Sequence, residues 1–521
     1  MRKNHTQALQ SLGFSLLVVL FMPLESHAAT CESLQALSLP NTTITLTQSV
    51  AAGMFSSPAP GQGGVQPTAA FKQLPAFCRV AATLRPSADS DIRIEVWMPA
   101  ANWNGKFQGV GNGGLAGFIT STAGSGVIER GMAEALKRGY ATASTDTGHT
   151  GDTAAPLLGH PEKLVDLAYR GVHEMTVTSK AVIRAFYDAN PKLSYWNGCS
   201  LGGRQGLVEA QRFPADYDGI IAGSPAILQT RLVTWSTHVG QAVLKDPRNM
   251  IPSSKYPMIH RAVVNACDAV DGTKDGLIDD PRRCRFDFKT IECKGEDSAS
   301  CLTAAQVESA QTITNPLIHP KTGETIFPGL ALGTELGWAL RMGGSAPQFY
   351  GTDYFKYVFY KDPNWDWRTF DLENAVGVAD RADHGMLNAT NPDLRAFRQR
   401  GGKLLLYHGW SDANLSAQPT IDYYERMRDT VGSGPIDESA RLFLAPGMGH
   451  CGSGEGPNVF DPVTALERWV EHGEAPATII ASHLSDGKVD RTRPLCPYPQ
   501  VAKYGGTGSI DEAWNFSCRW P

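Results

Sequence analysis

The chain has 521 residues, and 47 Lys and Arg against 52 Asp and Glu give it a formal net charge of −5. This balance excludes a generally basic nucleic-acid-binding protein, because such a protein needs a positive surface to displace counterions from phosphates. Hydrophobic residues make up 42% and charged residues 19% of the chain, which excludes a disordered acidic protein. We expect one large domain with a second domain or a long insertion, because the chain exceeds one minimal domain.

The N-terminus has the pattern of a secretory signal peptide. Arg2 and Lys3 make a basic start, an apolar run covers residues 12–22, and small residues lead to Ala29. The run is shorter than the roughly 20 apolar residues that a membrane-spanning helix needs. We therefore predict a signal peptide at residues 1–29, a secreted or periplasmic mature protein, and no membrane anchor after cleavage.

All ten cysteines follow the predicted signal peptide, and an even number in an exported chain predicts five disulfides. Their spacing predicts three local bonds, Cys267–Cys284, Cys293–Cys301 and Cys496–Cys518. The other four cysteines can pair in three ways: Cys31, Cys78, Cys199 and Cys451. No C-x-x-C spacing occurs in the sequence, which argues against a zinc site.

The first half of the mature chain alternates between strand and helix patterns. Residues 30–83 are rich in Ser, Pro and Gly, and we expect them to be irregular. Alternating apolar and polar residues predict strands, and apolar residues three or four apart predict helices. In chain order the predicted elements are a strand at 91–99, a strand ending in glycines at 105–114, a strand and loop at 139–149, a helix at 162–189 that Gly171 could interrupt, a strand at 193–200, a helix at 201–213 and a strand at 217–225.

The alternation stops between residues 226 and 391, where turns, four cysteines, an acidic loop and aromatic clusters follow one another. It then resumes with a strand at 401–412, a helix near 420–430, a strand at 441–450 and a helix near 462–472. Alternating strands and helices predict a mainly parallel sheet covered by helices. We predict one α/β domain, made of residues 30–225 and 392–521, which an insertion at residues 226–391 interrupts.

Residues 198–202, Gly-Cys-Ser-Leu-Gly, match the G-x-S-x-G pattern of a serine nucleophile. An apolar strand precedes Ser200 and a helix with small residues follows it, which is the context that this motif needs. The glycines allow a sharp turn that exposes the serine oxygen, and the turn aims the Leu201 N–H at a developing oxyanion. We predict that Ser200 is a nucleophile; the alternative is a glycine-rich structural turn.

Two residues that follow later strands are the candidates for the acid and the base. Asp412 comes just past the segment KLLLYHG, and His450 comes just past RLFLAPGMG. Their order after Ser200 is the order Ser, Asp, His of an α/β-hydrolase. Three other histidines compete for the role of base: His149, His384 and His408. Position in the chain favours His450 over these three. His149 precedes the serine, His384 lies in the insertion, and His408 directly follows the apolar strand.

The cysteines next to these residues strengthen the choice of His450. Cys199 precedes Ser200, and Cys451 follows His450. A bond between the two would hold the nucleophile and the base together, which makes Cys199–Cys451 and Cys31–Cys78 an attractive pairing. The alternative is that two cysteines are neighbours of these residues by coincidence.

The second oxyanion donor should come from a loop after an earlier strand. Gly111, Asn112 and Gly113 form the candidate loop, since glycines let backbone N–H groups approach a substrate oxygen closely. The alternative is an ordinary glycine-rich turn.

The acidic segment at residues 268–279 follows the start of an EF-hand-type loop. Counted from Asp271, oxygen ligands recur at alternate positions and Gly276 is the turn glycine, but Arg282 stands where such a loop carries a bidentate Glu. The predicted ligands are Asp271, Thr273 (carbonyl), Asp275, Leu277 (carbonyl) and either Asp268 or Asp279. These oxygens suit a structural Ca²⁺ and not zinc; the alternative is a solvated acidic turn.

Several longer motifs resemble the tannase and feruloyl esterase family of secreted serine esterases. They include WNGKFQGVGNGG, YWNGCSLGGRQG, CDAVDGTKDGLIDD, DPNWDW, RLFLAPGMGHC and TRPLCPYPQVAKYGGTGS, which are spread over most of the mature chain. The pair GCS-x-GGR and GM-x-HC is far more specific than G-x-S-x-G alone. The resemblance implies an α/β-hydrolase core, with a large calcium-binding lid domain inserted between the nucleophile and acid strands.

Carried over to this chain, the resemblance places the triad on Ser200, Asp412 and His450, bridged by Cys199–Cys451. It places calcium ligands on Asp268, Asp271, Thr273, Asp275 and Leu277. Family members split hydroxycinnamate esters, gallate esters or a terephthalate monoester, so the expected substrate is a small aromatic ester or an ester on a plant polymer. We predict a feruloyl esterase first, with a tannase or a terephthalate-monoester hydrolase as alternatives. A catalytically inactive, calcium-dependent binding protein is the alternative from another class.

Overall fold

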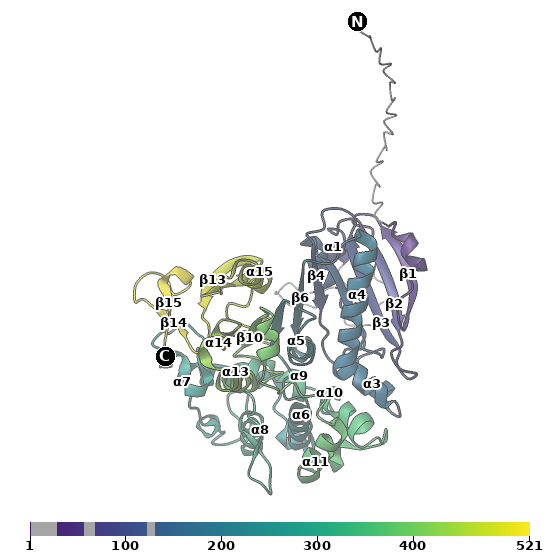
Figure 1. Cartoon of the computed structure of the whole chain (residues 1–521). Coiled ribbons are helices and arrows are strands. Elements are labelled where there is room, and N and C mark those ends of the chain that lie inside the picture. The colour runs from purple at the N-terminus through teal and green to yellow at the C-terminus, as the bar shows by residue number, and fades with distance from the viewer. Residues whose placement is uncertain (2–28, 57–67, 122–130) are drawn as a thin grey trace.

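The computed structural model describes Met1 and residues 29–56, 68–121 and 131–521. The predicted signal peptide at residues 1–29 therefore lies outside the described residues, apart from its two ends. A nine-stranded sheet has the order β1-β2-β3-β5-β4-β6-β7-β10-β11 (Figure 1). Its strands are β1 (Thr42–Val50), β2 (Phe77–Leu84), β3 (Ile92–Pro99), β4 (Lys106–Val110), β5 (Ala141–Thr145), β6 (Leu193–Cys199), β7 (Gly219–Gly223), β10 (Lys403–Gly409) and β11 (Ala440–Ala445).

The sheet is parallel over most of its width and antiparallel at one edge. Strands β5, β4, β6, β7, β10 and β11 pair in parallel, whereas β1, β2, β3 and β5 pair antiparallel. The expectation that residues 30–83 are irregular is wrong, because β1 and most of β2 lie there. Strand β1 is Thr-rich and half exposed at the sheet edge, so its apolar alternation is weak.

The helix predicted at residues 162–189 is present as one continuous helical segment. It consists of Pro161–Val165 (α3), a π-helical turn at Asp166–Arg170 and Gly171–Tyr187 (α4), and it continues through Gly171 with a helical φ of −59°. The helices are α1 (Thr68–Phe71), α2 (Met132–Lys137), α3 (Pro161–Val165), α4 (Gly171–Tyr187), α5 (Leu201–Arg212), α6 (Gln229–Leu244), α7 (Tyr256–Cys267), α8 (Ala304–Thr314), α9 (Ala339–Met342), α10 (Phe349–Asp353), α11 (Leu372–Asp383), α12 (Arg395–Gln399), α13 (Gln418–Val431), α14 (Ser433–Asp437) and α15 (Pro462–His472).

Each face of the sheet has its own hydrophobic core. Successive side chains on a strand point to opposite faces, and on β6 Tyr195 and Trp196 accordingly belong to different clusters. On β10, Leu405 joins the cluster of Tyr195, and Leu406 joins that of Trp196. Helices α4, α5 and α13 pack on the face of the sheet to which Trp196 points, and α2 and α15 pack on the face to which Tyr195 points. The helices thereby fix the carboxyl ends of the parallel strands, where the candidate site lies.

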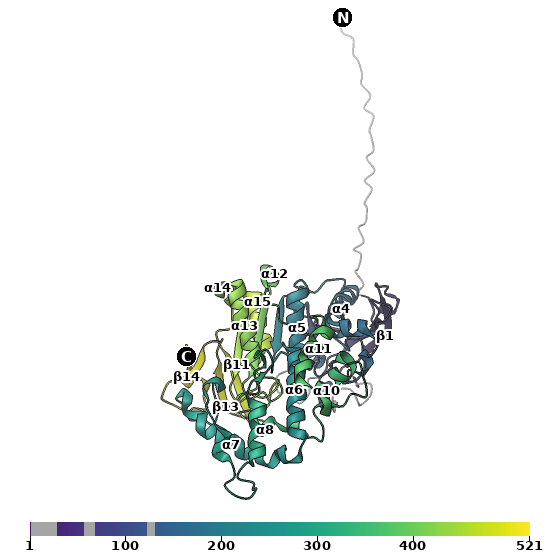
Figure 2. The same cartoon turned by 90° about the horizontal axis from the view of Figure 1, so that it is seen from below.

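Residues 226–391 stand between β7 and β10 and carry helices α6 to α11. Their hydrophobic cluster includes Trp235, Ile259 and Trp338, and Ala413 and Leu415 from the second half of the chain also belong to it. These helices gather below the sheet in Figure 1, and Figure 2 views the molecule from that side. The segment is therefore packed and largely helical.

The C-terminal residues form two antiparallel hairpins, β12 (Ile479–Ser485) with β13 (Lys488–Leu495) and β14 (Val501–Tyr504) with β15 (Phe516–Arg519). Strand β14 lies beside α7 in both views of the molecule (Figures 1 and 2). The hairpins therefore reach the segment in which the acidic loop follows α7.

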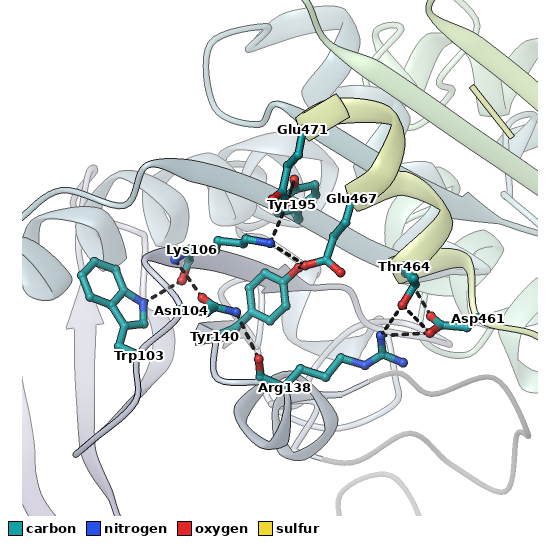
Figure 3. A network of polar contacts seen from close by, with 10 residues as sticks. All are labelled: Trp103, Asn104, Lys106, Arg138, Tyr140, Tyr195, Asp461, Thr464, Glu467 and Glu471. Carbon is teal, nitrogen blue, oxygen red and sulfur yellow. Dashed lines mark hydrogen bonds and ion pairs between the residues drawn. The ribbon is translucent and has the colours of Figure 1, made fainter. Parts of the chain in front are cut away.

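A network of polar side chains connects α15 to the amino ends of the central strands (Figure 3). Lys106 Nζ lies 2.8 Å from Glu467 Oε1 and 2.5 Å from Glu471 Oε1. Tyr195 donates to Glu471 at 2.9 Å, and Tyr140 donates to Glu467. Lys106 is opposite Leu193 at the start of β6, so this network lies at the end of the sheet away from the residues that follow β6.

The ten cysteines of the chain form five disulfides. The three predicted local bonds are present, and the remaining cysteines pair in the way that we considered most attractive. The bonds are Cys31–Cys78, Cys199–Cys451, Cys267–Cys284, Cys293–Cys301 and Cys496–Cys518. Among the described residues, no helix is both long and apolar enough to cross a membrane.

Candidate active site

Ser200 lies on a strained turn between β6 and α5. Its backbone has φ 64° and ψ −123°, a conformation that residues with a side chain rarely adopt. The Ser200 N–H donates to Gly223 O at 2.9 Å, which fixes the turn against β7. A Cβ on Gly198 would lie 2.4 Å from Gly202 O, so the turn requires glycine at this close approach. The half-buried serine thus stands at the amino end of α5, as the motif predicts.

Asp412 and His450 form a hydrogen-bonded pair. His450 Nδ1 is 2.8 Å from Asp412 Oδ2, and Asp412 Oδ1 accepts the backbone N–H groups of Asn414 and Leu415. Burial would raise the pKa of Asp412, but attraction to His450 and hydrogen bonds from His408 and His450 outweigh it and hold the pKa below its usual range. An ionised Asp412 favours the Nδ1–H tautomer of His450, which leaves Nε2 to accept a proton.

The Cys199–Cys451 disulfide joins the loops that carry the serine and the histidine. Its Cα atoms are 6.0 Å apart, and each cysteine is a direct neighbour of Ser200 or His450. Within the described part of the chain no hydrogen bond links Ser200 Oγ to His450. Such contacts are often long before substrate binds. The structure thus brings the three predicted residues to one site with the Asp–His pair already formed.

The competing histidines have other environments. His408 is buried, with Nδ1 2.9 Å from Thr420 Oγ1 and Nε2 3.3 Å from Asp412 Oδ2, so it supports the carboxylate. His149 is buried as well, and burial lowers its pKa to about 4. His384 follows the last residue of α11. Neither His149 nor His384 contacts Asp412 among the described residues.

The loop after β4 packs directly on the start of α5. A Cβ on Gly111 would lie 2.7 Å from Gly202 Cα, so the two segments touch through their backbones. The Gly111 N–H donates to Asn197 O at 3.0 Å, and the Asn112 N–H donates to Gln205 Oε1 at 3.1 Å. These two N–H groups are therefore occupied, and they are excluded as donors to a substrate oxygen.

Gly113 is the third residue of the predicted oxyanion loop, and its N–H differs from the other two. Its N–H donates to no described residue, and the space beside its Cα is open. Leu201 is the first residue of α5, where backbone N–H groups lack partners within the helix. Of the predicted residues Gly111, Asn112 and Gly113, Gly113 is thus the one whose N–H has no described partner, and Leu201 offers a second N–H at the start of α5.

A cavity of about 430 Å³ is lined by His450, whereas Ser200 and Asp412 are not among its described lining residues. Its wall from the insertion includes the exposed apolar side chains of Leu336 and Leu340, and its opposite wall includes Ser453 and Glu455. A volume of this size, with apolar side chains and a few polar groups, suits a small aromatic molecule. The larger cavity of about 500 Å³ has no residue of the predicted triad in its lining.

The predicted calcium loop is folded around its own carboxylates. Asp268 Oδ1 accepts the backbone N–H groups of Asp275 at 2.9 Å and Gly276 at 3.0 Å. Asp271 Oδ1 accepts the N–H of Thr273 at 2.7 Å. Each of these contacts uses one oxygen, so both carboxylates keep a second oxygen for another partner.

The loop also has carbonyl oxygens without partners. Among the described residues, neither Thr273 O nor Leu277 O accepts a hydrogen bond, although Leu277 is buried. Carbonyl oxygens without partners, next to carboxylate oxygens, are donors that fit a hard cation such as Ca²⁺. Arg493 of the C-terminal hairpin forms an ion pair with Asp275, and Lys503 donates to Asp271 O at 3.3 Å. These two cations could not be predicted from the acidic segment, because they lie more than 200 residues further along the chain.

Comparisons with known proteins identify the family to which the chain belongs. The family model described as tannase and feruloyl esterase matches residues 78–519. An uncharacterized esterase of Xanthomonas campestris pv. campestris is 36% identical over 547 residues, covering 95% of this chain and 92% of the relative. A probable feruloyl esterase B-2 of Aspergillus terreus is 35% identical over 462 residues, covering 84% of this chain and 85% of the relative.

Solved structures show the same fold. The crystal structure of feruloyl esterase B from Aspergillus oryzae matches with a TM-score of 0.86 at 30% identity, covering 94% of this chain and 99% of that chain. Tannin acyl hydrolase from Aspergillus niger matches with a TM-score of 0.72 at 23% identity, over 93% of this chain and 92% of that chain. The predicted α/β-hydrolase fold is thereby confirmed. The chain belongs to the tannase and feruloyl esterase family, and it is a carboxylic-ester hydrolase of the feruloyl esterase type.

Proposed function

We propose that the protein hydrolyses hydroxycinnamate esters of plant polymers through an acyl-enzyme on Ser200. The observation that carries this proposal is the placement of Ser200 and the Asp412–His450 pair on two loops that one disulfide joins. The names of the relatives as feruloyl esterases support the choice of acyl group. A signal peptide at residues 1–29 would deliver the enzyme outside the cytoplasm, where disulfides are stable and plant polymers are accessible.

The mechanism follows from the positions of these groups. Ser200 Oγ attacks the ester carbonyl while His450 Nε2 takes its proton, and His450 then protonates the leaving alcohol. Asp412 holds the imidazole tautomer and stabilises the imidazolium. The N–H groups of Leu201 and Gly113 bind the negative oxygen of the tetrahedral intermediate. In the second half of the reaction His450 takes a proton from a water molecule, whose oxygen attacks the acyl carbonyl. The bond to Ser200 Oγ then breaks, His450 returns the proton to Ser200, and the free acid leaves.

The test of the proposed substrate is the turnover of methyl ferulate against that of methyl gallate by the purified enzyme. We expect a higher kcat/KM for methyl ferulate. A higher value for methyl gallate would identify a tannase instead. No hydrolysis of either ester, or of a small chromogenic ester, would contradict the proposed function.

We infer that residues 226–391 form a lid domain and that its acidic loop binds a structural Ca²⁺. The residues that would hold the ion are Asp268, Asp271, Thr273, Asp275 and Leu277. The unpartnered carbonyl oxygens and the free second oxygens of Asp268 and Asp271 support this assignment. Both carboxylate oxygens of Asp275 have protein partners, the Leu277 N–H and Arg493, so Asp275 would have to exchange one of them for the ion. The positive charge of the ion would hold the carboxylates and carbonyls of the loop together. The proposed reaction uses no group of this loop.

Removal of calcium should lower the melting temperature and leave kcat nearly unchanged while the protein stays folded. An ion that binds only the native state stabilises it by about 2.7 kcal/mol when its free concentration is a hundred times Kd. Asp271→Ala should reproduce the effect of a chelator, whereas Asp429→Ala, an exposed acid on α13, should not. Thermal melts with chelator and with added calcium measure the difference. An unchanged melt would rule out the site, and a collapse of kcat in folded protein would make the ion catalytic.

A further inference from the structure

One imidazole ring connects two walls of the cavity beside His450. His260, on α7, has Nδ1 2.9 Å from Glu335 Oε2 and Nε2 2.8 Å from Glu455 Oε2. Glu335 begins the short 3₁₀ helix Glu335–Gly337 in the insertion, whereas Glu455 lies in the loop that follows His450. His260 therefore fixes the insertion against the loop of the candidate base.

The contacts of these three side chains set their charges. Glu335 is fully buried, and its Oε1 accepts the Gly333 N–H at 2.8 Å. Burial would lower the pKa of His260, but the hydrogen bonds to Glu335 and Glu455 outweigh it and raise the pKa to about 9. The hydrogen bond from His260 lowers the pKa of Glu455. One imidazole ring thus lies between two glutamate side chains, so a charge on His260 offsets the charge of only one of them.

Glu455 presents this excess charge to the cavity. Its side chain is 57% exposed, and it lines the cavity together with His450. Apart from His450, it is the one titratable side chain among the described lining residues. The guanidinium of Arg341 contacts the wall residue Asn414, but Arg341 is 6% exposed and also donates to Ser236. The charge that a bound molecule meets in the described wall is thus negative.

We propose that Glu455, positioned by His260, is a specificity-determining residue that selects against esters whose acyl part carries a carboxylate. The proposal rests on the proposed function, because it requires the acyl part of the ester to occupy this cavity when the carbonyl is at Ser200. Two negative charges within several ångströms repel each other, and the cavity holds no free described cation to offset this. Neutral and cationic aromatic esters should therefore be preferred, and a terephthalate monoester should be a poor substrate.

The test uses three methyl esters that share one benzoyl core. Dimethyl terephthalate is neutral, monomethyl terephthalate carries a carboxylate, and methyl 4-(aminomethyl)benzoate carries an ammonium group. For the native enzyme we expect kcat/KM to be roughly tenfold lower for the carboxylate than for the neutral ester. Glu455→Gln should raise the carboxylate-to-neutral ratio by roughly 3- to 30-fold and lower the ammonium-to-neutral ratio. Higher salt should weaken both preferences of the native enzyme.

Glu455→Gln should keep the structure of the cavity wall, because glutamine retains an oxygen that can accept the His260 N–H. Glu308→Gln, an exposed acid on α8, changes the net charge equally and should leave the three ratios unchanged. His260→Gln removes the cation, so it should lower the carboxylate-to-neutral ratio further, and a thermal melt checks that it is folded. Unchanged ratios in Glu455→Gln, with the neutral ester still hydrolysed, would overturn the inference and leave the proposed function intact. No hydrolysis of any ester by the native enzyme would overturn both.

Discussion

Replacing Ser200 by Ala should abolish ester hydrolysis, with kcat on methyl ferulate falling by roughly 10⁴-fold or more. The reason is that no other hydroxyl in the described structure stands on a strand-to-helix turn between the Leu201 N–H and the Asp412–His450 pair. The protein should stay folded, because the change removes one oxygen from a half-buried side chain. The measurement is kcat of the purified variant together with its thermal melt.

The matched control is Ser433→Ala, because this serine is exposed at the start of α14 and is not one of the site residues. It should keep the native kcat. If Ser200→Ala retained substantial hydrolysis, the nucleophile would be another residue. Retained binding of a ferulate ester by Ser200→Ala, without turnover, would agree with an acyl-enzyme mechanism.

Replacing Cys199 and Cys451 together by Ala should lower kcat by roughly 10- to 100-fold at a temperature where the variant is folded. The bond holds the neighbours of Ser200 and His450 with their Cα atoms 6.0 Å apart, and a misplacement of about 1 Å can cost roughly 100-fold in rate. The melting temperature should fall as well, because the bond closes a loop with a sequence separation of 252.

The control is the double variant Cys293→Ala and Cys301→Ala, which removes a bond with a sequence separation of 8 in the insertion. It should change local stability and leave kcat within about twofold. Equal losses of kcat in the two double variants would show that the Cys199–Cys451 bond has no catalytic role. A folded Cys199/Cys451 variant with native kcat would leave it a stabilising role alone.

The central part of the site could be predicted because each residue lies in a local pattern. Ser200 has glycines on both sides between a strand and a helix, and Asp412 and His450 follow the apolar strands β10 and β11. In a parallel sheet the residues after neighbouring strands meet at one edge. The cysteines beside Ser200 and His450 then indicated the disulfide that the structure contains.

Contacts between distant segments could not be predicted in this way. The choice of Gly113 in the oxyanion loop depends on Gln205, which lies 93 residues beyond Asn112 and occupies its N–H. The ion pair of Arg493 with Asp275 spans 218 residues. Neither pair is marked by a motif, because each depends on how the sheet and the C-terminal hairpins fold.

The helices within the insertion and the strand β1 at the sheet edge were not predicted, for a different reason. Helix α6 is buried on most of its surface, and it contains threonines such as Thr234 and Thr237, which donate to backbone carbonyls four residues earlier. Its apolar residues therefore do not form one stripe. Strand β1 has the opposite problem, since it is half exposed and its apolar positions are few. Both α6 and β1 are stabilised by contacts with neighbouring elements, and these contacts leave no clear pattern in their own sequences.

The central claim, that Ser200 is the nucleophile of a serine esterase, is tested most directly by covalent labelling with a fluorophosphonate and peptide mapping by mass spectrometry. The account predicts one equivalent of label on Ser200, loss of methyl ferulate hydrolysis in proportion to labelling, and no label at this position in Ser200→Ala. His450→Ala should slow the labelling strongly, because the serine loses its base. Full hydrolytic activity after stoichiometric labelling of Ser200, or inactivation with the label on a different residue, would contradict it.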